Sequence, residues 1–112
     1  MLDNLQYILN DDGTTSKVSF EEYLALVKAD REGFHKRRIV HQVHVKRGKH
    51  KLFVSTVFLG LNHQYGQGPP LIFETMIFGD RNLVEQYCDR YSTLEEAKAG
   101  HAVAVEIARQ RL

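Results

Sequence analysis

Residues 52–73 read LFVSTVFLGLNHQYGQGPPLIF, an uncharged run that decides the fold. Two segments rich in β-branched and aromatic residues, 52–59 and 71–78, flank a loop of Gly, Pro and polar residues. Both segments are apolar at successive positions, which is typical of strands buried on both faces. The Gly and Pro residues of 60–70 would leave backbone groups unsatisfied in lipid, so we reject a membrane span. The pattern predicts two central strands joined by a long loop.

Strand periodicity continues on both sides of this run. Residues 39–46 alternate between apolar and polar side chains, which predicts a further strand. A two-residue turn at 47–48 would pair Val43 with Leu52. Residues 83–91 alternate weakly and are expected to form an edge strand. The predicted sheet therefore has about four antiparallel strands.

The N-terminal third combines a short apolar segment with a helix signal. Residues 5–9 are expected to form a short strand or an extended arm, because a turn rich in Asn, Asp and Gly follows them. Ser19 and Glu22 have the spacing of a capping box. They predict a helix over about 19–31, ending near Gly33.

A second capping box, Ser92 with Glu95, predicts a C-terminal helix. One apolar stripe runs through it: Leu94, Ala97, His101, Ala104, Val105, Ala108 and Leu112. Gly100 interrupts this helix, and close packing against the sheet would explain it. The predicted fold is a single α+β domain over residues 1–112, with an N-terminal helix and a C-terminal helix packed on the sheet.

Composition narrows the class of protein. A chain of 112 residues is long enough to bury a core without disulfide or metal staples. Cys88 is its one cysteine, which excludes an internal disulfide and a multi-cysteine zinc site. The first residues carry no secretory signal pattern, so a cytoplasmic location is expected. No cofactor is predicted.

The central motif, VSTVFLGLNHQYGQGPPLIFETMIFG at 54–79, resembles a family of small uncharacterised proteins frequent in bacteriophage and prophage genomes. The resemblance continues in YCDRYSTLEEAKAGHAVAV at 87–105 and, more weakly, in YILNDDG at 7–13. The family pattern more often has Asp at the position of Asn62, which argues against a need for charge there. The resemblance implies a phage-type origin and therefore a location in the host cytoplasm. It implies no particular activity.

The loop at 60–70 is the first candidate site. It presents Asn62, His63, Gln64 and Tyr65 between glycines, and these residues could contact a ligand or a partner. The alternative is a solvated loop whose glycines serve only the backbone geometry. No Gly-Lys-Ser/Thr follows the loop, so it is not a P-loop.

Glu74 raises a second possibility, because a carboxylate in an apolar strand must be protonated or paired. His101 lies on the helix stripe expected to meet this sheet, so the two side chains could approach each other, with His63 at the mouth. Such a group could be a carboxylate orienting an imidazole, or a metal site of two His and a carboxylate. The alternative is a structural polar pair within the core.

The third candidate is a basic stretch. Residues 35–51 contain seven Lys or Arg, four His and no acid. Phosphate contacts would come from Arg37, Arg38, Lys46, Arg47, Lys49 and Lys51. The alternative is a hairpin whose charges prevent strand aggregation.

These patterns leave three functions open. The leading hypothesis is a phage-type accessory protein that binds a host or phage protein, or a small ligand, through residues 60–70. The others are a small hydrolase, with or without a metal, using His63, Glu74 and His101, and a weak nucleic-acid binder using the basic hairpin at 36–51. A sheet that is apolar on both faces also favours a homodimer or a bound partner.

Overall fold

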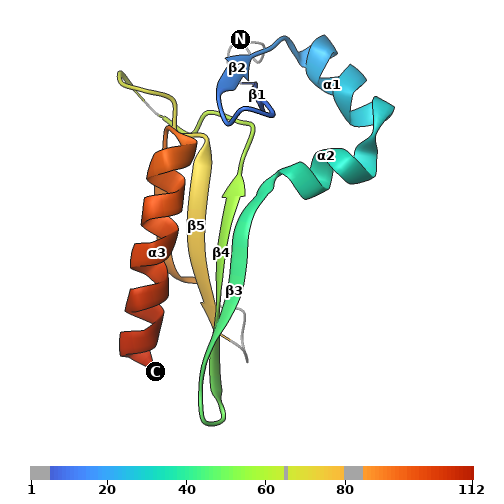
Figure 1. The fold of residues 1–112 in the computed structure, drawn as a ribbon. Coiled ribbons are helices and arrows are strands. Elements are labelled where there is room, and N and C mark those ends of the chain that lie inside the picture. The colour runs from blue at the N-terminus through green and yellow to red at the C-terminus, as the bar shows by residue number, and fades with distance from the viewer. Residues whose placement is uncertain (1–5, 65, 80–84) are drawn as a thin grey trace.

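The structure, a computed structural model, describes residues 6–64, 66–79 and 85–112. Its elements run in the order β1 (Tyr7–Leu9), β2 (Thr15–Lys17), α1 (Phe20–Ala29), α2 (Arg31–Arg37), β3 (Ile39–Arg47), β4 (His50–Phe58), β5 (Phe73–Gly79), β6 (Glu85–Tyr91) and α3 (Leu94–Arg111) (Figure 1). Strands β1 and β2 form a small hairpin, and β3, β4, β5 and β6 form an antiparallel sheet in that order. The predicted α+β class, with a C-terminal helix on a four-stranded sheet, is confirmed.

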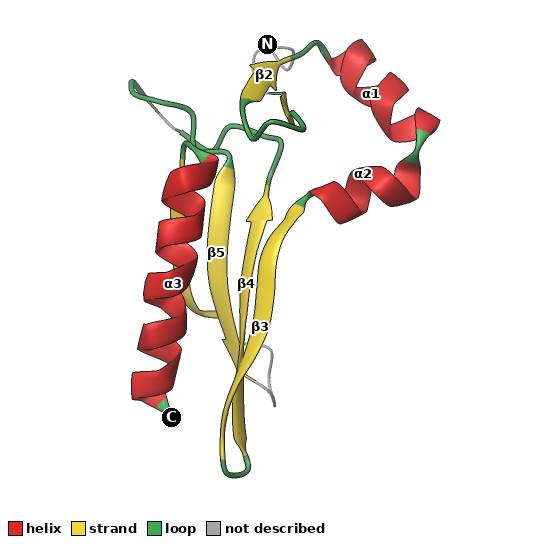
Figure 2. Cartoon of the chain, viewed as in Figure 1, coloured by secondary structure: helices red, strands yellow, loops and turns green. Residues whose placement is uncertain are grey.

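Helix α3 packs across one face of the sheet, and strand alternation decides which residues meet it (Figure 2). One core cluster joins Val54 and Ile77 to Ala104 and Ala108 of α3. A second joins Phe58, Ile72 and Phe73 to Ala97. Full burial of a side chain such as Val54 or Ile77 contributes about 2 kcal/mol, and the alanines let the helix approach the strands closely.

The opposite face of the sheet, called the open face below, carries the alternate residues of the four strands. Its described residues are Gln42, His44 and Lys46 of β3, Lys51, Phe53, Ser55 and Val57 of β4, Glu74, Met76 and Phe78 of β5, and Cys88 and Arg90 of β6. Among the described elements, only α3 lies across the sheet, so no described helix covers this face. We expected a second layer or a partner on it, because the strands are apolar on both sides.

The β3–β4 hairpin extends beyond the rest of the sheet. Its turn falls at Gly48 and Lys49, one residue later than predicted, so Val43 pairs with Val54 and not with Leu52. Gly48 has a φ of +60°, which suits the first position of such a turn and explains the shift. Because β5 pairs with β4 only from Leu52 onward, the hairpin tip projects as a two-stranded ribbon (Figure 1).

The N-terminal part contains two helices where the sequence predicted one. The predicted capping box is present, with Ser19 capping α1 and Glu22 returning the bond, but α1 ends at Ala29. Asp30 then caps a second helix by accepting a hydrogen bond from the Gly33 backbone at 3.0 Å. Gly33 was expected to end the helix. It instead lies within α2, where a Cβ on this residue would collide with the Asp30 carboxylate. Helices α1 and α2 form an arm beside the sheet, which raises the radius of gyration to 15.3 Å, against about 13 Å for a compact domain of this length.

Helix α3 begins one residue later than its predicted capping box. Thr93 caps it, and its hydroxyl accepts a bond from the Glu96 backbone at 3.1 Å. Gly100 packs against the sheet as predicted, because a Cβ there would collide with the Tyr91 ring and hydroxyl. This contact fixes where the helix crosses β6.

Candidate functional site

Asn62 organises the loop at 60–70 from within. Its Oδ1 accepts hydrogen bonds from the backbone of Gln64 at 2.8 Å and of Leu71 at 3.0 Å. The backbone N–H of His63 also donates to the Leu71 carbonyl at 2.9 Å. A carboxylate oxygen at this position could accept the same two bonds, so the site requires an acceptor and not a charge. Asn62 therefore positions the loop instead of presenting its amide oxygen to a ligand.

The other loop residues offer a limited contact surface. His63 and Gln64 are half-buried, and the Gln64 amide lies 3.4 Å from the Pro69 carbonyl. Residues 66–69 are exposed, and all of them except Gln67 are Gly or Pro. Tyr65 lies outside the described residues. The predicted binding role of the loop stays a prediction, and its strongest described feature is its internal bonding.

Glu74 and His101 do not meet, so the predicted pair is wrong. Glu74 lies on the open face, where its Oε2 accepts a hydrogen bond from Arg90 Nε at 2.9 Å. His101 lies on α3, against the opposite face. The two faces alternate along β5, so a residue between Phe73 and Thr75, which face the helix, must point away from α3. Arg90 supplies the partner that a buried carboxylate needs.

His101 instead ends a buried chain of hydroxyl groups beneath α3. Its Nδ1 lies 2.7 Å from the Thr56 hydroxyl, which is 2.6 Å from the hydroxyl of Thr75. The residue is 4 % exposed, and its ring stacks on that of exposed His41 with centroids 4.3 Å apart. Burial, and to a lesser degree His41, lowers the pKa of His101, so the ring is neutral at pH 7. The arrangement ties α3 to β4 and β5.

Two buried polar atoms at this interface lack a hydrogen-bond partner among the described residues, His101 Nε2 and the Tyr91 hydroxyl. Burial raises the pKa of the Tyr91 phenol, and the Thr75 side chain partly opposes this rise. Within the described ranges, no group of three or more metal-ligating side chains occurs. His63, Glu74 and His101 therefore do not form the metal site considered above.

The six predicted phosphate contacts fall into two groups. Arg38 is structural, since its Nε and Nη2 donate to the carbonyls of Phe58 and Leu59 at 3.0 and 2.9 Å. Arg37 lies beside it, with a long 4.0 Å ion pair to Asp30. The other four residues are at the hairpin tip, about 30 Å away along β3. The six therefore do not form one patch.

The hairpin tip gathers positive charge that no described acidic side chain pairs with. Lys46 lies directly opposite Lys51, and Arg47 lies opposite His50. Lys49 occupies the turn, and none of the four predicted Lys and Arg residues makes an ion pair with a described residue. Like charges directly opposite each other in a sheet destabilise it. A bound anion would relieve this repulsion.

A row of three aromatic rings lies beside these cations on the open face. His44 and Phe53 have centroids 4.8 Å apart, and Phe53 and Phe78 have centroids 6.4 Å apart. Lys46 and Lys51 are the next residues toward the tip on the same face. Sequence reasoning missed this row because it depends on the pairing of β4 with β5. The signal was present in the alternation of Lys51, Phe53 and Ser55, but a covered face was expected there.

The remaining polar groups of the open face bond mainly to one another. Gln42 Nε2 donates to the Ser55 hydroxyl at 2.9 Å, and Glu74 accepts from Arg90. Cys88 Sγ lies 3.6 Å from the same Glu74 oxygen. Among its described side chains, the face therefore offers aromatic and cationic groups and few polar atoms that could hydrogen-bond to the edges of a ligand.

A cleft adjoins the same end of the sheet on the helix side. It has a volume of about 480 Å³ and lies between β3 and the last turns of α3. Lys46, Arg47 and Arg109 line it together with apolar residues. Arg109 pairs with Glu106 at 3.3 Å, which reduces its share of the positive charge. The cations of β3 thus reach both sides of this edge strand.

No family model, curated protein or solved structure matches the chain. Among the described helices, none has the length and apolar character needed to cross a membrane.

Proposed function

We propose that this protein is a binding module for single-stranded nucleic acid, which it holds on the open face of its sheet. The observation that carries the proposal is the aromatic row His44, Phe53 and Phe78 lying next to the lysine pair Lys46 and Lys51. Aromatic side chains on a four-stranded sheet are a common platform for unpaired bases, with cations placed to contact the phosphates.

The dimensions suit two or three nucleotides. Neighbouring strands lie about 4.8 Å apart, so a row across β3, β4 and β5 spans about 10 Å. Each stacked base contributes about 1–3 kcal/mol. Lys46 and Lys51 lie one pleat repeat away from the rings, about 7 Å along the strands, and could contact the backbone of the same nucleotides.

The proposed interaction would depend on charge more than on sequence. The tip cations and the cleft beside β3 provide positive charge to follow a phosphate backbone. Gln42 and Ser55, two described polar side chains beside the rings, are bonded to each other. We therefore expect weak base preference and strong dependence on salt.

Protein binding through residues 60–70 is a second candidate. It is supported by the hydrogen bonds of Asn62, which join the two ends of the loop at Gln64 and Leu71 before any partner arrives. The phage-type origin, the cytoplasmic location and the homodimer stay predictions. A second copy of the chain on the open face would compete directly with nucleic acid.

The test is fluorescence anisotropy with a labelled 15-residue oligothymidylate in 50 mM salt. Replacing Phe53 and Phe78 by Leu keeps the face apolar and removes stacking, so the double variant should bind at least about tenfold more weakly. Val103→Leu, an exposed change on α3, is the control. Equal affinity in all three proteins, preference for duplex DNA, or a light-scattering mass of two chains that oligothymidylate does not alter would each reject the proposal.

A further inference from the structure

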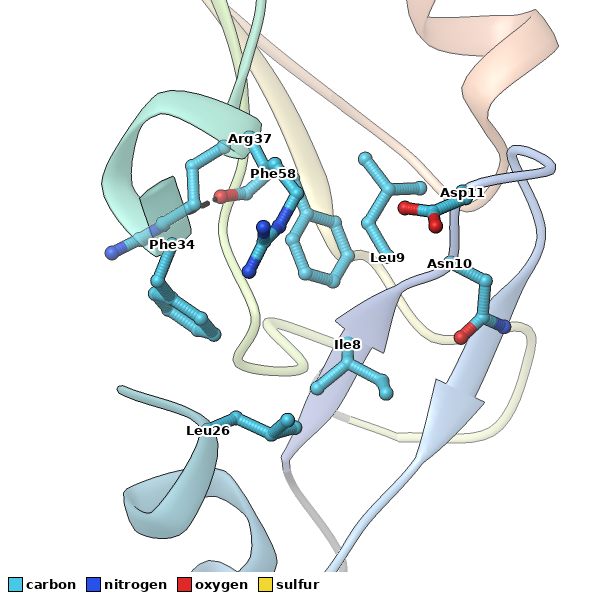
Figure 3. Close-up of a pocket in the computed structure, with 9 residues that line it drawn as sticks. Ile8, Leu9, Asn10, Asp11, Leu26, Phe34, Arg37 and Phe58 are labelled. Carbon is cyan, nitrogen blue, oxygen red and sulfur yellow. Dashed lines mark hydrogen bonds between the residues drawn. The ribbon is translucent and has the colours of Figure 1, made fainter. Parts of the chain in front are cut away.

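A cavity of about 330 Å³ lies at the other end of β3, between the β1–β2 hairpin, the α1–α2 arm and the end of β4 (Figure 3). We infer that it binds a small amphipathic molecule with an apolar body and one carboxylate. The site is separate from the open face and does not depend on the function proposed above. Its volume lies within the range of small-molecule sites.

Apolar side chains from four elements surround the cavity. Ile8 and Leu9 come from β1, Leu26 from α1, Phe34 from α2 and Phe58 from β4, and Figure 3 shows them around a common space. Phe34 and Phe58 are buried, at 9 % and 2 % exposed, and form the base of the site. Tyr23 supports Phe34 by an edge-to-face contact with centroids 5.4 Å apart.

The arm leaves apolar surface that a ligand could cover. Helix α1 has no buried residue, and Leu26 on the cavity wall is 40 % exposed. A ligand seated between Leu26 and Phe58 would contact both the arm and the sheet end. It would add apolar burial where the chain itself provides little.

Charge selects the head group. Arg37 and Arg38 line the cavity, and two donors of Arg38 already hold the carbonyls of Phe58 and Leu59. The Arg37 guanidinium has only its long contact to exposed Asp30 among the described residues, so it can turn to an anion. Asp11 also lines the cavity and disfavours a second negative group. The ligand is thus a monocarboxylate of about medium-chain fatty-acid size, not a polyanion.

The experiment uses 11-(dansylamino)undecanoate as a fluorescent probe, with decanoate and decanol as competitors. The chain contains no Trp, so dansyl emission excited directly has little protein background. Decanoate should displace the probe and decanol should do so less well. Arg37→Gln should weaken decanoate about threefold to fivefold and leave decanol unchanged. Leu26→Gln should weaken both competitors.

Matched controls lie outside the cavity. Arg31→Gln removes an exposed arginine of the same helix, and Val103→Gln changes an exposed apolar residue of α3. Neither should affect the probe. Equal loss in Arg31→Gln and Arg37→Gln, no effect of Leu26→Gln, or displacement of the probe by oligothymidylate would each overturn the inference. Probe binding that Phe78→Leu alone reduces would place it on the open face, with the same consequence.

Discussion

The lysine pair at the hairpin tip should have opposite effects on binding and on stability. Lys46 and Lys51 face each other in the β3–β4 ladder, and neither makes an ion pair with a described residue. Replacing both by Gln removes a like-charge repulsion worth about 0.2–1 kcal/mol. The melting temperature of the double variant should therefore rise by about 2 °C at low salt, and by less as salt screens the charges.

The same variant should bind single strands less tightly. Each phosphate contact to a single strand contributes about 0.7 to the slope of log affinity against log salt, so losing two lowers the slope by about 1.4. Raising the salt threefold, from 50 to 150 mM, should therefore reduce the ratio of natural to variant affinity about fivefold, because 3 raised to the power 1.4 is about 5. Anisotropy titrations over this range measure the slope, and calorimetry measures the stability.

A variant with Lys28 and Lys98 changed to Gln is the matched control, because it removes the same charge from α1 and α3. Its salt slope should equal that of the natural protein. Two results would refute a phosphate-binding tip: a tip variant that keeps the full slope, or one that loses stability while its binding is unchanged. The first result would mean that the tip does not contact phosphates.

Three further predictions concern the scaffold. The pKa of His101 is lowered below its ordinary 6.5, so on acidification the unfolded chain takes up a proton before the folded chain does. The stability that depends on His101 is therefore full above about pH 6.5 and falls below that pH by at most about 1.4 kcal/mol per pH unit. Denaturant titrations at several pH values should show a flatter pH dependence for His101→Gln. Asn62→Asp should keep the stability of the loop within about 0.5 kcal/mol, whereas Asn62→Ala should cost about 1–3 kcal/mol by leaving two backbone donors unpaired, a difference that amide exchange at Gln64 would report. Gly100→Ala should destabilise the protein by about 1 kcal/mol despite its better helix propensity, because overpacking against Tyr91 outweighs the gain; a higher melting temperature would contradict this.

The fold could be predicted largely because its signals are local. Alternation along 39–46 and the apolar stripe through α3 each depend on residues close in sequence. The errors arose at glycines that are compatible with two different local structures. Gly33 resembles a helix end but accommodates the cap of α2, and Gly48 begins the hairpin turn that was expected to end with it.

The site was harder to predict because it depends on pairing between distant strands. Glu74 was expected near His101 since both lie in apolar surroundings, but strand parity places them on opposite faces. Phe53 and Phe78 are neighbours only because β4 and β5 pair in one register. A single sequence predicts that each strand alternates, and it does not say which residues stand side by side.

Photo-cross-linking tests the central claim most directly. An oligothymidylate carrying 5-iodouracil would be bound at low salt and irradiated, and the linked residue would be located by mass spectrometry. Stacking on the open face predicts cross-links to Phe53 or Phe78 that are lost when both are replaced by Leu. Cross-links confined to residues 60–70 or to α3, or none under conditions where the oligonucleotide is bound, would contradict the account.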